Sequence, residues 1–137
     1  MSVSVGLALA LVLGAAGVVL AQEAVAANDT IKKLLQKRLE IVIEIHTLLV
    51  EGYKVGEVEF RQVAEARMMM LSAQLDLCET KKERVKVHHE TVEAAKELLR
   101  IVTDLAKAEE VGQVDVLKAK AQLLEAQIAL ERLKASK

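Results

Sequence analysis

The sequence predicts an all-α fold made of long amphipathic helices. The 137-residue chain contains no proline, no tryptophan, one tyrosine and one phenylalanine, while 53% of its residues are hydrophobic and 28% are charged. Such a composition, with apolar residues recurring every three or four positions, is typical of coiled coils and long helices. Beyond residue 22 the only glycines are Gly52, Gly56 and Gly112, so these are the strongest available breaks.

The chain begins with an apolar leader. Residues 5–21 include no charged side chain and end in Val19, Leu20 and Ala21, a boundary typical of a signal-peptidase site, although residues 1–4 carry no Lys or Arg. We predict a signal peptide over residues 1–21, with an uncleaved membrane anchor as the alternative. The helical domain is then residues 22–137, and we expect it to be exported to the periplasm or cell envelope.

The first predicted helix covers residues 29–51. Its apolar residues recur at helical spacing: Ile31, Leu34, Leu35, Leu39, Val42, Ile45, Leu48 and Leu49. The β-branched run at residues 41–45 is compatible with a strand, but the helical period on both sides favours a helix.

The second predicted helix covers residues 57–111 without a break, which gives a rod on the order of 80 Å. Its apolar line has nearly heptad spacing and consists of Val63, Ala66, Met70, Ala73, Leu77, Val85, Val92, Ala95, Leu99, Val102 and Ala106. Between Thr80 and Thr91 this line thins and basic residues crowd in, so we expect the weakest packing or a local kink there.

The third predicted helix covers residues 114–134, with an apolar stripe of Val116, Leu117, Ala121, Leu124, Ile128 and Leu133. A helix of this length is marginal alone in water, and short glycine turns make neighbouring helices antiparallel. We therefore expect a three-helix antiparallel coiled-coil hairpin with one long central helix. The first and third helices pack along its two halves, and the two turns lie at opposite ends.

Two segments of the chain recur in the same order. Residues 55–58 (VGEV) return as residues 111–114 (VGQV), an offset of 56, and residues 71–77 (LSAQLDL) return as residues 124–130 (LEAQIAL), an offset of 53. Repeats of this length indicate one structural unit used twice.

At these residues the sequence resembles the TolC-type outer-membrane efflux family. Periplasmic helical hairpins of that family turn at a Tyr-x-x-Gly element and restart with Asp-Val-Leu-x-Ala. Here the corresponding elements are YKVG at residues 53–56 and DVLKA at residues 115–119, followed by the family-like run QLLEAQIAL at residues 122–130. The resemblance covers residues 53–134.

The resemblance implies an envelope location, close-packed antiparallel helices and self-assembly. In the family the turns gather at one tip that binds a periplasmic adaptor, so it implies that Tyr53, Gly56, Gly112 and Asp115 bind such a partner. Because nothing in this sequence is typical of a series of lipid-facing strands, we do not expect it to form an outer-membrane channel by itself.

Residues that carry chemistry are sparse. There is no nucleophile-base constellation and no Gly-rich phosphate loop, so we expect neither enzymatic activity nor a cofactor. A net charge of −1 argues against a nucleic-acid partner. Adjacent His88 and His89 point about 100° apart on a helix, and consecutive methionines, Met68, Met69 and Met70, fan around it, so we expect no metal site. Cys78 has no intrachain partner and is expected to be a small apolar residue on a helix, with interchain pairing or a reactive thiol as the alternative.

Together these features predict a non-enzymatic envelope coiled-coil protein with a structural or adaptor-like role, acting as a homo-oligomer. Two alternatives stay open. One is a soluble component of an efflux or transport system that docks to an adaptor. The other is a periplasmic metal-binding or chaperone-like helical protein that uses His88, His89 and the methionine run. Membrane contact is expected only through residues 1–21, if they are not cleaved.

Overall fold

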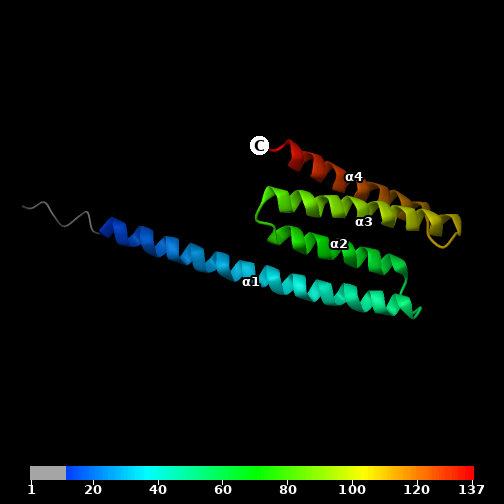
Figure 1. The fold of residues 1–137 in the computed structure, drawn as a ribbon, viewed down its shortest axis with the longest axis horizontal. Helices are drawn as coiled ribbons and strands as arrows, with labels where there is room; N and C mark the ends of the chain where they lie inside the picture. The colour runs from blue at the N-terminus through cyan, green and yellow to red at the C-terminus, as the bar shows by residue number, and fades with distance from the viewer. Residues whose placement is uncertain (1–11) are drawn as a thin grey trace, which may run out of the picture. The chain divides into compact units, whose positions relative to one another are not determined.

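The computed structural model describes residues 12–137, with side chains from residue 20 onward. Over this range the chain forms four α-helices and no strand, which confirms the all-α prediction (Figure 1). The helices are α1 (Val12–Lys54), α2 (Phe60–Leu77), α3 (Lys81–Lys107) and α4 (Gln113–Ala135).

The chain divides into two units, residues 1–34 and residues 35–137. In the first unit, residues 12–34 are the beginning of α1, and the side chains of residues 20–34 are exposed. Residues 1–11 of the predicted leader lie outside the described residues, whereas its residues 12–21 are helical. None of the helices in the described range has a run of residues long and apolar enough to cross a membrane.

The predicted long central helix is wrong, because the chain breaks between α2 and α3. Helix α2 ends at Leu77, and α3 begins at Lys81 behind a capping box. The Thr80 hydroxyl accepts a hydrogen bond from the Glu83 backbone N–H (3.2 Å), and the Glu83 carboxylate accepts one from the Thr80 N–H (3.0 Å). This motif satisfies the backbone donors that a new helix leaves free, so it starts a helix without glycine or proline.

Because of the break, α2 and α3 lie side by side. The two glycine-containing turns therefore lie at the same end of the unit (Figure 1). The expectation that the turns lie at opposite ends is therefore wrong. It followed from the unbroken helix, which would have separated them by its full length.

Within residues 35–137, α3 lies between α2 and α4, and its backbone comes within 8 Å of both, Cα to Cα. Alanines allow this approach: Ala95 is fully buried where α3 meets α4, and Ala94 is buried on the side of α2. The core has two clusters, one around Ala64, Leu98, Val102, Val116 and Ala119, and one around Val92, Ala95, Ala126 and Leu130. Burying a side chain such as Leu98 contributes about 1.5–3 kcal/mol.

The C-terminal end of α4 is tied to the start of α3. The Lys81 ammonium donates to the Lys134 carbonyl (3.5 Å) and to the Ser136 carbonyl. The Lys134 carbonyl belongs to the last turn of α4 and Ser136 is the C-cap of the helix, where a cation is favourable because the helix dipole is negative there.

Helix α1 packs on α2 more loosely. No Cα pair joins the two helices within 8 Å in the described chain, and contact is made through longer side chains. Val42 is buried, and Arg38 forms an ion pair with Asp76 of α2 (2.6 Å). Because Val42 and His46 on this face of α1 are larger than alanine, the backbone of α1 stays farther from α2 than that of α3 stays from α4.

Candidate functional site

The predicted turn residues lie at one end of the residue 35–137 unit. Tyr53 contacts Phe60 edge-to-face, with ring centroids 5.1 Å apart and planes at 69°. Gly56 has φ of 80°, a left-handed conformation that glycine adopts without a steric penalty. Gly112 is the N-cap of α4 with φ of −86°, which any residue can adopt, and its N–H donates to the Asp115 carboxylate (3.4 Å).

The two turns share one backbone geometry. At the end of α1, the Gly56 N–H donates to the Tyr53 carbonyl (3.1 Å) and the Glu57 N–H to the Gly52 carbonyl (2.9 Å). At the end of α3, the Glu109 N–H donates to the Ala106 carbonyl (3.1 Å) and the Glu110 N–H to the Leu105 carbonyl (2.9 Å). Both pairs are Schellman motifs, with the left-handed residue at Gly56 and at Glu109, 53 residues further along the chain.

The next helix begins with the same contact after each turn. Glu59 is the N-cap of α2, and its N–H donates to the Gln62 side chain (3.2 Å). Likewise, the N–H of Gly112, the N-cap of α4, donates to the Asp115 side chain. These two pairs are again 53 residues apart. The structural equivalent of Gly56 is thus Glu109 and not Gly112, whereas the sequence match at an offset of 56 pairs the two glycines.

A shallow groove of about 310 Å³ runs between the turns. It is lined by Glu59, Phe60, Arg61, Ile101, Leu105, Glu110 and Val111. Tyr53 and Asp104 border a neighbouring open groove beside Phe60. The structure therefore brings the two turns together, although Gly56, Gly112 and Asp115 do not themselves line either groove.

The residues considered as metal ligands are dispersed. His88 is half-buried, and this burial lowers the pKa of its imidazole, while His89 is exposed. Met68 packs against the core cluster of Val92 and Ala95, whereas Met69 is largely exposed. Among the residues that the structure describes, no group of three or more His, Cys, Asp or Glu side chains could hold a metal ion.

Cys78 lies at the C-cap of α2. Its thiol donates to the Gln74 carbonyl (3.4 Å), which is one turn earlier on the same helix. Burial raises the pKa of this thiol, and the neighbouring Glu83 carboxylate raises it further. A thiol in this environment is largely protonated at neutral pH and is a poor nucleophile.

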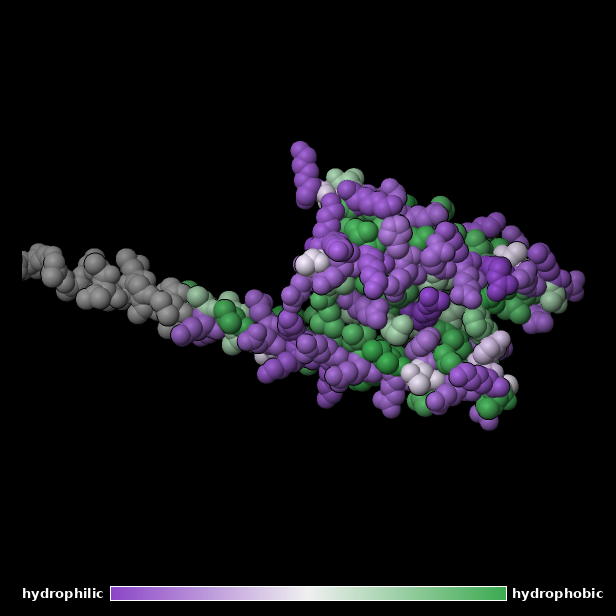
Figure 2. All heavy atoms as spheres, in the orientation of Figure 1, coloured by the Kyte–Doolittle hydropathy of each residue, from purple (hydrophilic) through white to green (hydrophobic). Residues whose placement is uncertain are grey.

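An apolar stripe lies on the surface of α4 and is here called the α4 stripe. It consists of five exposed residues at heptad spacing: Val114, Leu117, Ala121, Leu124 and Ile128. Leu117 and Leu124 keep 54% and 58% of their accessible surface. At 100° per residue this stripe is roughly 180° from the face that α4 packs on α3. Figure 2 shows hydrophobic residues, in green, reaching the surface between polar ones.

The apolar stripe predicted for residues 114–134 combines residues from two faces of this helix. Of the predicted stripe, Val116 is buried, whereas Leu117, Leu124 and Ile128 are exposed. The face that packs on α3 is made instead by Val116, Ala119, Leu123, Ala126 and Leu130. This second heptad line is visible in the sequence, but its alanines carry a weaker hydrophobic signal than the leucines of the opposite face.

A second stripe, here called the α1 stripe, lies on the part of α1 within residues 35–137. Ile41, Ile45 and Leu48 are all exposed there, while Val42 on the adjacent face is buried. A helix with exposed apolar residues at helical spacing beside a buried face has apolar surface for two neighbouring helices. Both stripes thus lie on helices with only one neighbour in the unit.

No protein-family model, no curated protein and no solved structure matches this chain.

Proposed function

We propose that this chain is a non-enzymatic coiled-coil protein of the cell envelope, with a structural or adaptor-like role in a helical assembly, and that it acts as a homo-oligomer. The observation that carries the proposal is the α4 stripe, an apolar face directly opposite the face that α4 packs on α3. Contiguous exposed apolar surface is costly in water and commonly marks an interface. The envelope location rests on the leader and on the resemblance to the TolC-type family.

We propose further that α1 with α2 and α3 with α4 are two copies of one hairpin unit. The matched Schellman motifs and N-caps at a separation of 53 residues support this. Buried residues agree at the same separation, as with Val63 and Val116, or Ala73 and Ala126. A duplicated hairpin packs with further copies of itself by the same faces, which is how repeat proteins extend.

The self-association of the full-length chain tests the proposal. Light scattering over a range of concentrations should show oligomers. Replacing two residues of the stripe, Leu117→Lys with Leu124→Lys, should shift the chain toward monomer, because lysine ammonium groups cannot be buried unpaired at an interface.

The matched control places the same two charges elsewhere on α4. Gln122 and Gln127 are exposed and lie outside the stripe, so Gln122→Lys with Gln127→Lys should leave the oligomer intact. A full-length chain that stays monomeric at every concentration would contradict self-assembly.

A second function, docking to an adaptor of an efflux or transport system, is favoured by the position of the turns. Both turns lie at one end and flank a groove with the Tyr53 and Phe60 rings beside it, as expected for a tip that contacts a partner. The double variant Tyr53→Ser with Asp115→Asn should weaken capture of a periplasmic adaptor.

Asparagine at position 115 retains an oxygen that can accept from the Gly112 N–H, so the start of α4 is preserved. Lys82→Ala, an exposed change at the opposite end of α3, is the control. Equal capture by both variants and the unaltered chain would count against the docking function.

A further inference from the structure

The interface between α2 and α3 is made of two helix faces, and each of them has a counterpart in one of the two exposed stripes. On α2, Ala64 packs with Leu98 of α3, and Met68 packs against Val92 and Ala95. Leu71, which is buried, and Leu75, which is half-buried, lie on the same face of α2 at 100° per residue. On α3, the opposing face includes Ala94, Leu98 and Ile101. One ion pair crosses this interface, from Arg67 to Glu97 (3.4 Å).

The α4 stripe is the counterpart of this α2 face. Moving 53 residues along the chain, the separation of the two turns, takes Ala64, Met68, Leu71 and Leu75 to Leu117, Ala121, Leu124 and Ile128. Four positions on this face of α2 therefore correspond to four exposed residues of α4. Helix α4 thus exposes the face that corresponds to the α2 face packed on α3. Among the described residues, no helix covers this face of α4.

The α1 stripe is, in the same way, the counterpart of the α3 face. Moving 53 residues back takes Ala94, Leu98 and Ile101 to Ile41, Ile45 and Leu48. On α3 these positions are buried or half-buried against α2, and on α1 all three are exposed. The unit thus carries both halves of its own internal interface, one on each outer helix.

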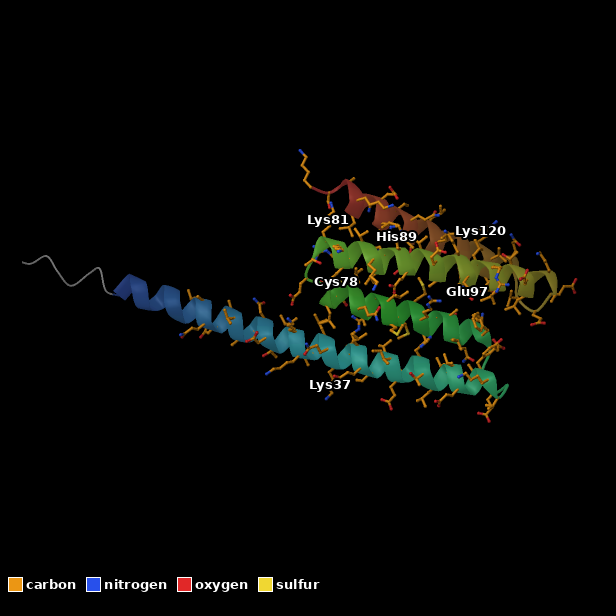
Figure 3. The ribbon with its side chains drawn as sticks, viewed as in Figure 1. Lys37, Cys78, Lys81, His89, Glu97 and Lys120 are labelled. Carbon is orange, nitrogen blue, oxygen red and sulfur yellow. The ribbon has the colours of Figure 1, made fainter. Side chains whose placement is uncertain are left out.

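The charges correspond as well. The ion pair of Arg67 with Glu97 maps onto Lys120 of α4 and Glu44 of α1, so the signs are retained at both positions. Figure 3 labels Glu97 on α3 and Lys120 on α4. Both Lys120 and Glu44 are exposed, and neither makes an ion pair within the described range of the chain. Each is available to a second molecule.

We propose that the α4 stripe of one copy packs antiparallel on the α1 stripe of a second copy, in the register of the internal α2–α3 interface, with Lys120 beside Glu44 of the second copy. This inference rests on the proposed self-assembly and names its surfaces. Because the stripes carry Leu117 and Ile41 where the internal interface has alanines, the two helices pack farther apart than α2 and α3 do.

This contact is head-to-tail, so each dimer still has one free stripe of each kind. Further copies add at both ends until the rotation closes a ring or an open filament grows. The competing arrangement is a two-fold pairing of α4 with α4, which would leave the α1 stripe uncovered and Glu44 unpaired.

Charge reversal in the full-length chain tests the interface. Lys120→Glu alone and Glu44→Lys alone each place like charges together, and each should weaken self-association roughly fivefold per interface. The chain with both changes restores opposite charges and should regain the original assembly. An equimolar mixture of the two single variants should also assemble, because every interface then joins opposite charges.

Lys118→Glu and Glu40→Lys are the matched controls. Their counterparts 53 residues away are Glu65 of α2 and Glu93 of α3. Both counterparts stay exposed although α2 and α3 pack together, so neither change should affect assembly. Reversals at positions 44 and 120 that change nothing in an oligomeric chain would overturn this interface and leave the proposed function standing. A chain that is monomeric throughout would overturn both.

Cross-linking distinguishes the two arrangements independently. In a Cys78→Ala background, a short bismaleimide should link Lys120→Cys of one copy to Glu44→Cys of another and produce a ladder of dimers, trimers and larger species. Efficient dimer formation by the Lys120→Cys chain alone, without the second cysteine, would show pairing of α4 with α4 and overturn the proposal.

Discussion

At the residue scale, the most informative position is Glu109. It is the only described residue other than glycine with a positive φ, 61°, and it occupies the place in the second turn that Gly56 occupies in the first. A side chain in this conformation costs roughly 1–2 kcal/mol, because Cβ approaches the neighbouring carbonyl oxygen. The second turn therefore retains the hydrogen bonds of the first at a steric cost.

Glu109→Gly should stabilise the chain by about 1 kcal/mol, since glycine relieves this strain. Gly56→Ala should destabilise it by a similar amount for the same reason. Urea unfolding followed by circular dichroism measures both. Glu110→Gly is the control, because Glu110 is exposed and has no positive φ, and there glycine should not stabilise. Equal effects at positions 109 and 110 would contradict the argument.

The stabilisation that the Glu83 carboxylate provides depends on pH. The backbone N–H groups of Thr80 and Glu79 donate to its carboxylate and hold its pKa below the ordinary value. A depressed pKa means that the stabilisation is present above the unfolded value of about 4.3 and is lost as the pH falls through the folded pKa.

The difference in unfolding free energy between the unaltered chain and Glu83→Gln should therefore shrink as the pH is lowered from 5 to 3. Chemical unfolding at a series of pH values measures it. Glu65→Gln removes an exposed carboxylate that accepts no hydrogen bond from the described residues, and it serves as the control. A constant difference for Glu83→Gln across this range would be inconsistent with the capping role.

At the scale of elements, the break between α2 and α3 shows how local chemistry overrides periodicity. The predicted apolar line resumes at Val85 beyond the break, and every residue predicted for it between Val63 and Ala106 is buried or half-buried, which supports the spacing. The helix nevertheless stops, because Thr80 and Glu83 satisfy the backbone groups of a new start. The Thr-x-x-Glu motif was available in the sequence as the signal.

Thr80→Ala should destabilise the chain by about 1 kcal/mol, because the Glu83 N–H loses its side-chain acceptor. Thermal unfolding monitored by circular dichroism is the measurement. Lys82→Ala, an exposed change in the same turn, should have little effect. If Thr80→Ala instead left stability unchanged, the hydroxyl would not be what defines the start of α3.

At the scale of the whole packed unit, residues 35–137, small residues decide which helices approach closely. Ala95→Leu places three more carbon atoms where α3 meets α4 and should destabilise the chain by about 1–3 kcal/mol or more. Ala121→Leu adds the same atoms on the exposed α4 stripe, so it should not destabilise the unit. Comparison of their denaturant midpoints is the test, and equal losses would contradict the packing described above.

Three features of this protein could be predicted without the structure: it is all-α, it turns near Gly56 and Gly112, and one line of apolar residues through α2 and α3 is buried. These features depend on local propensity and on the 3.6-residue period, which operate within a short stretch of chain. Tyr53 and Asp115 could likewise be placed near turns from the sequence.

Two features depend on how the helices pack together: the two turns share one end, and some apolar residues of the described chain have no neighbouring helix. Leu117 and Val116 are equally apolar in the sequence, yet one is exposed and the other is buried. The helical period cannot distinguish the buried residue from the exposed one when a helix is apolar on two faces. It identifies the apolar positions but not the face that another helix covers. That choice depends on how many helices lie beside it, and within residues 35–137 each outer helix has one.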